Sequence, residues 1–157
     1  MRESHVIIGV ISDTHGLLRP EAVDALRGSD LILHAGDIGA KSIIPALRKV
    51  APVVAIRGNV DEHESWARKF PATNVAEAAS FSFYMLHDVK KLDLNPGAAG
   101  FAAVIFGHSH KPEFSFKDGV LFFNPGSAGP RRFRLPVSVG KITVRDGKLE
   151  PEIVKLG

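Results

Sequence analysis

The chain has 157 residues, of which 45% are hydrophobic and 24% are charged, values that are typical of one globular domain and argue against a disordered, collagen-like or coiled-coil protein. The absence of cysteine excludes disulfide bonds, thiolate metal sites and cysteine nucleophiles. The net charge is only +3, and the basic residues are scattered apart from Lys90-Lys91 and residues 131–134, so the charge carries no strong signal for nucleic acid binding.

The first half of the chain alternates between predicted strands and helices. Three apolar runs rich in β-branched residues predict strands that are buried on both faces: 6–11, 31–35 and 53–56. Helices are predicted over 20–27, which ends just before Gly28, and over 42–50, where Ser42 is the expected N-cap. This βαβ pattern predicts a mostly parallel sheet. Since ligand sites form at the carboxyl ends of parallel strands, the loops after these three strands should converge.

The second half is richer in strand patterns. The strands predicted there are 81–86, 103–106, 114–116, 120–123, 142–144 and a last one that ends near Val154. The Asp118-Gly119 and Asp146-Gly147 pairs predict tight turns of two hairpins. The segment 93–100 fits either a short helix or a loop, and the pattern leaves both open.

Five polar clusters each follow directly after a predicted strand. They are Asp13-x-His15, Gly36-Asp37, Gly58-Asn59, His87 and Gly107-His108-Ser109-His110. Carboxylate, amide and imidazole groups together bind divalent ions such as manganese, iron, zinc, nickel or cobalt. Each cluster alone is a weak signal, because such short combinations arise by chance and a lone histidine is usually structural. Five of them in one order, each at a strand end, predict a metal site.

These clusters resemble the motifs of the calcineurin-like metallophosphoesterase family: Asp-x-His, Gly-Asp, Gly-Asn-x-Asp/Glu, a lone His, and Gly-His-x-His. The resemblance spans nearly the whole chain. The length, and the run 124–127 followed by Pro130-Arg131, are similar to the minimal bacterial and archaeal phosphodiesterase branch. The resemblance implies an α/β fold, a four-layer α/β/β/α sandwich of two mixed β-sheets flanked by helices, with residues 1–157 as one such domain.

The resemblance also implies a role for each ligand. The first metal would be held by Asp13, His15 and His110, the second by Asn59, His87 and His108, and both would be bridged by Asp37. Two ions about 3.5–4 Å apart can share a carboxylate and a hydroxide that attacks phosphorus. Catalysis is assigned to Asp37, Asn59 and His108. The expected cofactors are two divalent ions, Mn²⁺ first, with Ni²⁺, Fe²⁺, Zn²⁺ or Co²⁺ as alternatives.

Some positions depart from the family pattern. Val60 stands where many relatives have a histidine thought to protonate the leaving group, which predicts a need for a good leaving group or another acid. Asp61 matches the family's carboxylate and is expected to fix the loop rather than to transfer a proton. Asp88 follows His87 where relatives often have glycine, which can alter the geometry of that ligand.

Other residues have two interpretations each. His34 is a buried, hydrogen-bonded core histidine, or it supports the metal ligands from behind. Residues 124–127 form a turn that closes a strand, or a wall of the metal pocket. Arg131 lies in a solvated loop, or contacts a phosphate through its planar guanidinium. His5 and His63 are expected at the surface.

The predicted function is that of a metal-dependent phosphodiesterase acting on a small phosphoester. One alternative is a non-catalytic protein-binding scaffold, like the retromer's sorting subunit, whose pocket departs from the full histidine set that this chain retains. Another is a monoesterase with the same chemistry, although 157 residues leave no space for the usual extra loops. No apolar run approaches the roughly 20 residues of a membrane span, and residues 1–5 lack the apolar core of a secretion signal. We therefore expect a cytoplasmic protein without a membrane partner, and leave a homo-oligomer open.

Overall fold

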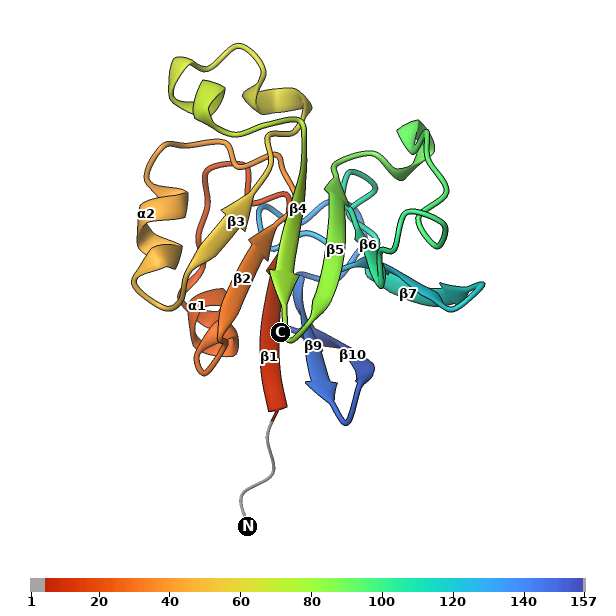
Figure 1. Cartoon of the computed structure of the whole chain (residues 1–157). Coiled ribbons are helices and arrows are strands. Elements are labelled where there is room, and N and C mark those ends of the chain that lie inside the picture. The colour runs from red at the N-terminus through yellow and green to blue at the C-terminus, as the bar shows by residue number, and fades with distance from the viewer. Residues whose placement is uncertain (1–4, 157) are drawn as a thin grey trace.

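The computed structural model describes residues 5–156 and contains two β-sheets that pack face to face (Figure 1). The first sheet consists of β1 (His5–Ile11), β2 (Leu31–His34), β3 (Val53–Ala55), β9 (Ser138–Arg145) and β10 (Lys148–Lys155). The second consists of β4 (Thr73–Ala78), β5 (Phe81–Leu86), β6 (Ala103–Ile105), β7 (Glu113–Lys117) and β8 (Val120–Asn124). Residues 1–4, part of the expectation about a secretion signal, lie outside the described chain.

The first sheet has the order β10-β9-β1-β2-β3. Its strands β1, β2 and β3 are parallel, as the βαβ pattern predicts, and are joined through α1 (Pro20–Leu26) and α2 (Ile43–Arg48). Both helices cover the outer face of this sheet with buried side chains such as Leu26 and Leu47. Ser42 stands at the N-cap position of α2 but makes no capping hydrogen bond, because its backbone is already helical (φ −80°, ψ −15°).

The hairpin of β9 and β10 completes the first sheet, with β9 antiparallel to β1. Its turn is the predicted Asp146-Gly147 pair, and β9 begins at Ser138, four residues before the predicted strand. Because β9 pairs with β1, this hairpin extends the first sheet on the side of β1 that faces away from β2 and β3.

The second sheet has the order β4-β5-β6-β8-β7, in which β5, β6 and β8 are parallel and the edge strands β4 and β7 are antiparallel to their neighbours. The Asp118-Gly119 turn joins β7 to β8 as predicted. Strand β4 was not predicted, because only its Ala76 is buried and no apolar run marks it. The segment 93–100 is a loop of turns and contains no helix. Together with the 3₁₀ turn η3 (Val89–Lys91), it lies over the outer face of this sheet.

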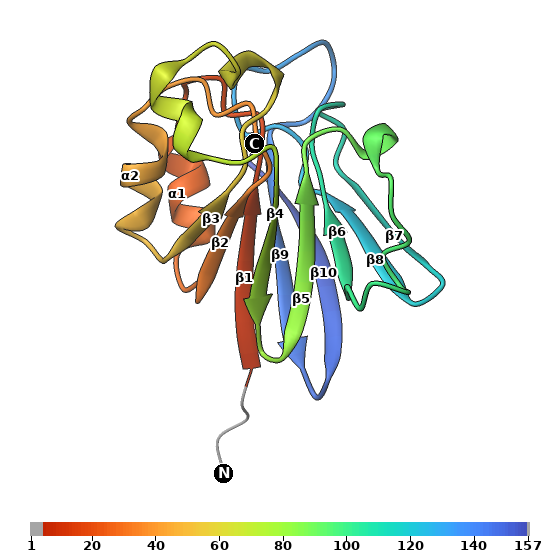
Figure 2. The same cartoon turned by 45° about the horizontal axis from the view of Figure 1, so that its top comes forward.

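The largest core lies between the two sheets. It is made of side chains from both inner faces that are fully buried, among them Ile8, Val10, Leu33, Phe83, Met85, Ile105, Leu121 and Phe123. This packing aligns the sheets so that the loops after β1, β2, β3, β5 and β6 gather at one end of the molecule (Figure 2). Within residues 5–156, no helix is long and apolar enough to cross a membrane.

Candidate metal centre

The predicted ligands lie on five loops, which follow β1, β2, β3, β5 and β6. Backbone hydrogen bonds tie these loops together. Asp13 N–H donates to Gly36 O (2.9 Å), and Gly107 N–H donates to His87 O (3.0 Å). The first bond joins loops of one sheet and the second joins loops of the other. Their common position at one end of both sheets brings residues that are up to about a hundred positions apart into one site.

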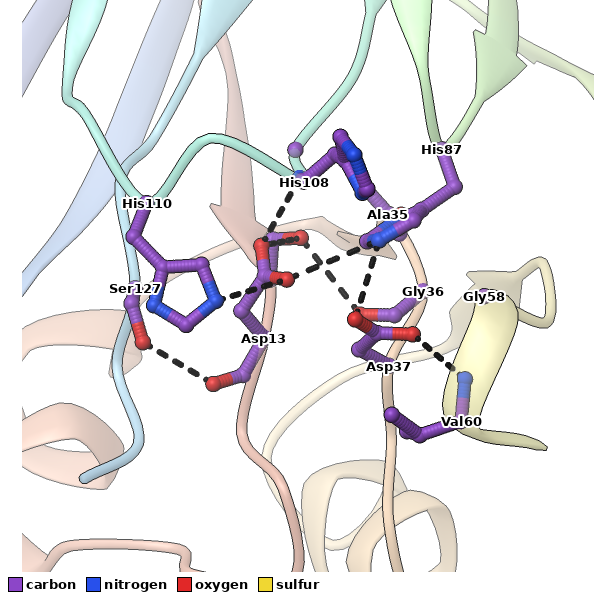
Figure 3. Close-up of polar contacts among 12 residues, drawn as sticks. Asp13, Ala35, Gly36, Asp37, Gly58, Val60, His87, His108, His110 and Ser127 are labelled. Carbon is purple, nitrogen blue, oxygen red and sulfur yellow. Dashed lines mark hydrogen bonds and ion pairs between the residues drawn. The ribbon is translucent and has the colours of Figure 1, made fainter. Parts of the chain in front are cut away.

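Several ligand residues have a left-handed backbone conformation. They are Asp13 (φ 55°), His15 (47°), Asp37 (56°), His108 (73°) and His110 (64°). This conformation costs a non-glycine residue about 1 kcal/mol or more, and such residues cluster at functional sites. The loops therefore hold these residues in strained backbone conformations, and the side chains of Asp13, Asp37 and His110 point toward one another (Figure 3).

Two of the motif glycines are required by close approach. A Cβ on Gly107 would lie 2.6 Å from Asp13 Oδ2 and would also overlap Ser12 Oγ. A Cβ on Gly58 would overlap the backbone and carboxylate of Asp37. Only glycine lets these loops come this close to the two carboxylates.

The most buried part of the site contains Asp13, Asp37 and His87. His87 Nε2 lies 3.1 Å from Asp37 Oδ2 and 3.6 Å from Asp13 Oδ1. The other ring nitrogen, Nδ1, donates to Ala35 O at 2.7 Å, because a carbonyl can only accept. In the neutral ring, Nε2 therefore directs a lone pair at two carboxylate oxygens (Figure 3). Acceptors that face one another in this way are satisfied by a cation between them, either a proton on Nε2 or a metal ion.

A second group contains Asp13, His15 and His110. His110 Nε2 lies 3.4 Å from Asp13 Oδ1 and 3.3 Å from His15 Nε2. His15 Nε2 is also 3.8 Å from Asp13 Oδ1 and 3.7 Å from Asp37 Oδ2. Each of the two carboxylates therefore lies within reach of histidines from both groups, and Asp13 Oδ1 belongs to both.

The remaining two predicted ligands, Asn59 and His108, are exposed and lie on the solvent side. The ring of His108 stands edge-on to the ring of His87, with centroids 5.3 Å apart. His108 Nε2 lies 3.9 Å from Asp88 Oδ2, so Asp88 faces the exposed histidine. The structure thus brings five of the seven predicted ligands into two tight groups and leaves two at their open side.

The two buried carboxylates are held by different donors. Ser12 Oγ–H donates to Asp13 Oδ2 at 2.7 Å, and His108 N–H donates to the same oxygen at 3.2 Å. Val60 N–H donates to Asp37 Oδ1 at 3.1 Å. In each carboxylate one oxygen is engaged by the protein, and the other faces the histidines.

Asp61 fixes the loop after β3, as predicted. Its carboxylate is fully buried and accepts from the N–H groups of Ile38, Gly39 and Gly58, each at 2.9 Å. These bonds join the loop after β3 to the loop that carries Asp37. The role of Asp61 is therefore to position the loops that present Asp37 and Asn59.

His34 is a buried, hydrogen-bonded core histidine. Its Nδ1 accepts from Gly36 N–H (3.1 Å), and its Nε2–H donates to Thr14 Oγ1 (3.0 Å), whose own proton goes to Ile38 O. Burial lowers the pKa of His34 to about 4. His34 therefore links the first two ligand loops as a neutral ring. The contribution of Thr14 was missed, because nothing in its sequence context distinguishes it from an ordinary turn residue.

Residues 124–127 support the site from the side of the second sheet. Asn124 Nδ2 donates to Gly107 O and to Ser109 Oγ, both at 3.1 Å, and shapes the loop of His108 and His110. Ser127 Oγ–H donates to Asp13 O at 3.0 Å. The segment thus acts as a turn that also braces the ligand loops. Arg131 lies in an exposed loop, where its Nε–H donates to Leu135 O. His5 and His63 are exposed, as predicted.

Burial and nearby carboxylates shift the pKa values of His87 and His15 in opposite directions. Burial works to raise the pKa of Asp37, but contact with His87 and the Val60 N–H outweighs it and lowers the pKa to about 2. Burial works to lower the pKa of His87, but Asp37 and Asp13 raise it above its ordinary value. Burial lowers the pKa of His15, although Asp37 and Asp13 oppose the shift. The site therefore combines an ionised Asp37 with a neutral His15, whose ring can serve as a metal ligand.

The donor set fits divalent metal ions. Asp13 Oδ1, His87 Nε2 and His110 Nδ1 are buried side-chain atoms with no hydrogen-bond partner among the described residues. An unpaired buried polar atom costs about 1–3 kcal/mol, so each needs an explanation. For Asp13 Oδ1 and His87 Nε2 the explanation is a cation, because both atoms point into the space that the ligands share. Carboxylate oxygens and imidazole nitrogens are ligands of the borderline divalent metals.

A pocket of about 290 Å³ opens beside the buried ligands. Its walls include Asn59 and His87 of the site, together with Arg57, Tyr84 and Lys91. Val60, next to Asn59, is 48% exposed. The pocket therefore connects the ligands to solvent and offers space for part of a substrate.

Known proteins resemble this chain in sequence and in fold. The calcineurin-like phosphoesterase superfamily domain matches residues 6–147. A probable metallophosphoesterase of Methanothermobacter thermautotrophicus is 35% identical over 97% of this chain and 94% of its own. An archaeal phosphodiesterase structure has a TM-score of 0.77 at 22% identity, covering 95% of this chain and 100% of its own. Vps29 from Entamoeba histolytica complexed with Zn²⁺ has a TM-score of 0.69 at 24% identity, covering 97% and 100%.

The two structural likenesses show a shared fold, and the family model and the 35% identical relative show common descent. Calcineurin-like phosphoesterases bind divalent metals, and the two candidate ligand groups of this chain lie just after β1, β2, β5 and β6. The chain belongs to the calcineurin-like phosphoesterase superfamily.

Proposed function

We propose that the chain is a metal-dependent phosphodiesterase with a dinuclear centre, and that residues 1–157 form one catalytic domain. The observation that carries this proposal is the pair of ligand groups that share Asp13, in which buried acceptor atoms face one another without a donor. One ion would be held by Asp13, His15 and His110, and the other by Asn59, His87 and His108 with Asp37 between them. Mn²⁺ is the first candidate, and Ni²⁺, Fe²⁺, Zn²⁺ and Co²⁺ suit the same donors.

When bound, two such ions would neutralise charge on the phosphoryl oxygens and lower the pKa of a shared water, which as hydroxide attacks phosphorus. The chain's own contribution is positioning. Ala35 O fixes the ring of His87, Asp61 fixes the loop of Asn59, and Ser12 holds Asp13. His108 stands exposed at the open side, where it can contact a phosphoryl oxygen of the substrate.

The leaving group would lie in the pocket beside the buried ligands. Val60, the exposed neighbour of the pocket residue Asn59, brings no proton donor there, so the reaction would depend on a leaving group that needs little protonation. A diester with an acidic alcohol or phenol meets this requirement. The pocket's mixture of Arg57, Lys91 and Tyr84 suits a small polar or aromatic group.

A non-catalytic scaffold is the alternative that the Vps29 likeness raises. That structure is complexed with Zn²⁺, so metal binding by itself does not distinguish an enzyme from a scaffold. Turnover does distinguish them. The scaffold predicts a metal-loaded protein that hydrolyses neither diesters nor monoesters.

The test is hydrolysis of a bis-aryl phosphate by protein that has been exhaustively chelated and then reloaded with each candidate ion. We expect activity to be lost on chelation and regained with Mn²⁺ or a similar ion, with two ions per chain by elemental analysis. A matched aryl monoester assayed in parallel tests the diester preference. Full turnover by protein that elemental analysis finds empty would exclude the two-metal mechanism.

A further inference from the structure

Strand β7 forms one edge of the second sheet and pairs with β8 on one side only. All five of its residues are exposed. In both views β7 lies farther to the right than β10, which is an edge strand of the first sheet, so the first sheet does not cover β7 (Figures 1 and 2). An exposed edge strand is a template for pairing with another strand.

The unpaired main-chain groups of β7 belong to Phe114 and Phe116. Opposite them on β8 stand Phe123 and Leu121. Leu121 N–H donates to Ala102 O, and the Phe123 carbonyl accepts from the backbone just after β6, so both residues direct their main-chain groups away from β7. In an antiparallel pair, opposite residues either bond each other or both point outward. The N–H and C=O groups of Phe114 and Phe116 therefore point outward from the sheet.

The sequence of β7 is Glu-Phe-Ser-Phe-Lys, so a second copy running in the opposite direction presents residues that complement it at each position. Two copies of the strand, placed antiparallel about a two-fold axis at Ser115, set Glu113 opposite Lys117 of the second copy. The same register sets Phe114 opposite Phe116 and Ser115 opposite itself. Opposite charges and aromatic pairs directly across strands stabilise a sheet, whereas like charges destabilise it.

This register also matches both faces of the strand. Phe114 and Phe116 are 44% and 54% exposed, and they extend the inner face of the sheet, where the Phe114 ring stacks on the buried Phe123 with centroids 6.0 Å apart. Pairing would gather four phenylalanine rings on this face. Glu113 and Lys117 lie on the other face, where pairing would form two ion pairs. The outward main-chain groups, the aromatic side chains and the charges are thus all matched in the same antiparallel register.

We infer that two copies of this chain associate through β7 to form one continuous ten-stranded sheet. The pairing is self-complementary and closes at two copies, since each chain contributes the same strand. The contact is a single strand of five residues, so the dimer is weak and depends on protein concentration. The inference does not depend on the proposed catalytic activity.

Charge reversal tests the register by sedimentation equilibrium across a wide range of protein concentration. Glu113→Lys and Lys117→Glu each replace two ion pairs with two like-charge contacts, so each should weaken self-association about tenfold to a hundredfold. An equimolar mixture of the two variants should restore the dimer, because all cross-chain pairs are again opposite. The matched controls are Glu77→Lys on β4 and Lys148→Glu on β10, both exposed, which should associate like the unmodified chain.

Amide hydrogen exchange gives a second readout on the unmodified chain. The amides of Phe114 and Phe116 should become protected as concentration rises, while the amide of Ser115, which already faces β8, should not change. A chain that stays monomeric at all concentrations overturns the inference and leaves another protein as the occupant of the edge. A dimer that survives both charge reversals, or a mixture that does not reassociate, also overturns it.

Discussion

The candidate metal centre has two sides that are held in different ways. On the buried side, Asp13, Asp37 and His87 are nearly inaccessible to solvent, and each has one atom engaged by a protein donor or acceptor and another directed into the site. On the open side, Asn59 and His108 are exposed, and His108 has only a distant carboxylate near its ring. The side chains of the buried side are held in place by the fold, whereas those of the open side have fewer contacts with the rest of the protein.

The largest expected effect comes from removing the charge that, in the proposed dinuclear centre, the buried side shares between two ions. Asp37→Asn keeps the size of the side chain but removes a carboxylate within reach of both His15 and His87. Both metals should weaken together, and activity should fall a thousandfold or more, because each ion supplies several kcal/mol of transition-state stabilisation. Metal stoichiometry by elemental analysis, with a melting curve to confirm folding, is the measurement.

Asp13→Asn is the matched comparison for Asp37→Asn, because Asp13 Oδ1 also belongs to both ligand groups. If Asp37 is the bridge, Asp13→Asn should lose mainly the ion held with His15 and His110. A folded Asp37→Asn protein with two tightly bound metals and near-normal activity would refute the bridging role.

Removing one histidine from each group separates the two ions. His87→Ala should empty the site on the buried side, and His110→Ala should empty the site shared with His15, each with about a thousandfold loss of activity. His108→Ala should weaken metal binding less than His87→Ala, because an exposed ligand loses conformational freedom when it binds. Titration of each folded variant with Mn²⁺ checks the order. Equal loss of both ions in His87→Ala and in His110→Ala would contradict separate sites.

The support of the buried side can be weakened without touching a ligand. Asp61→Asn removes the negative charge from the acceptor of three N–H groups and replaces one acceptor oxygen with an NH2 group, so at least one N–H loses its acceptor. This should destabilise the protein by about 2–3 kcal/mol. Chemical denaturation measures this loss. Glu62→Gln, an exposed neighbour on the same loop, is the control and should change stability little. An unchanged midpoint for Asp61→Asn would show that the loops are held by other contacts.

A smaller effect is expected at the open side, where Val60 supplies no proton. Val60→His should reduce the dependence of the rate on leaving-group pKa, with rate gains of about tenfold or more for poor leaving groups. A series of aryl diesters of different leaving-group pKa measures the dependence. If Val60→His binds metal normally and leaves the dependence unchanged, the absence of an acid at this position is not its cause.

The smallest effect at neutral pH concerns His34, which lies behind the buried side. Its pKa of about 4 in the folded protein is below the ordinary 6.5, because burial outweighs the charges of Asp13, Asp61 and Asp37, while His87 adds to the lowering. Between pH 6.5 and 4 the unfolded chain therefore binds a proton that the folded chain does not, so stability should fall as pH falls through this window. The slope should reach at most about 1.4 kcal/mol per pH unit.

Denaturation midpoints measured across that pH window, for the unmodified chain and for His34→Asn, test this prediction. The asparagine oxygen can replace Nδ1 as the acceptor from Gly36 N–H, and asparagine does not titrate. The variant should show a flatter dependence on pH whatever its absolute stability. An identical slope in both proteins would assign the dependence to other groups.

Much of the fold could be predicted because burial leaves a pattern in the sequence. Strands β1, β2 and β5 lie in or against the core and appear as apolar runs, whereas β4 buries only Ala76 and has no such pattern. The expected hairpins were found because Asp-Gly turns are local: Asp118 and Asp146 have a left-handed backbone followed by glycine. The layer over the second sheet is a loop with a 3₁₀ turn, since residues 93–100 carry no helical period strong enough to decide between helix and loop.

The sequence by itself determined the ligand types and their order after successive strands, because a parallel sheet places every such loop at one end. Only the tertiary structure decided how those ligands divide into a buried and an open side. That division depends on distances between loops of two different sheets, such as His87 Nε2 to Asp13 Oδ1, and on bonds such as Ala35 O to His87. The free edge of β7 was likewise decided by sheet order, because a strand's unpaired groups depend on its neighbours and not on its own residues.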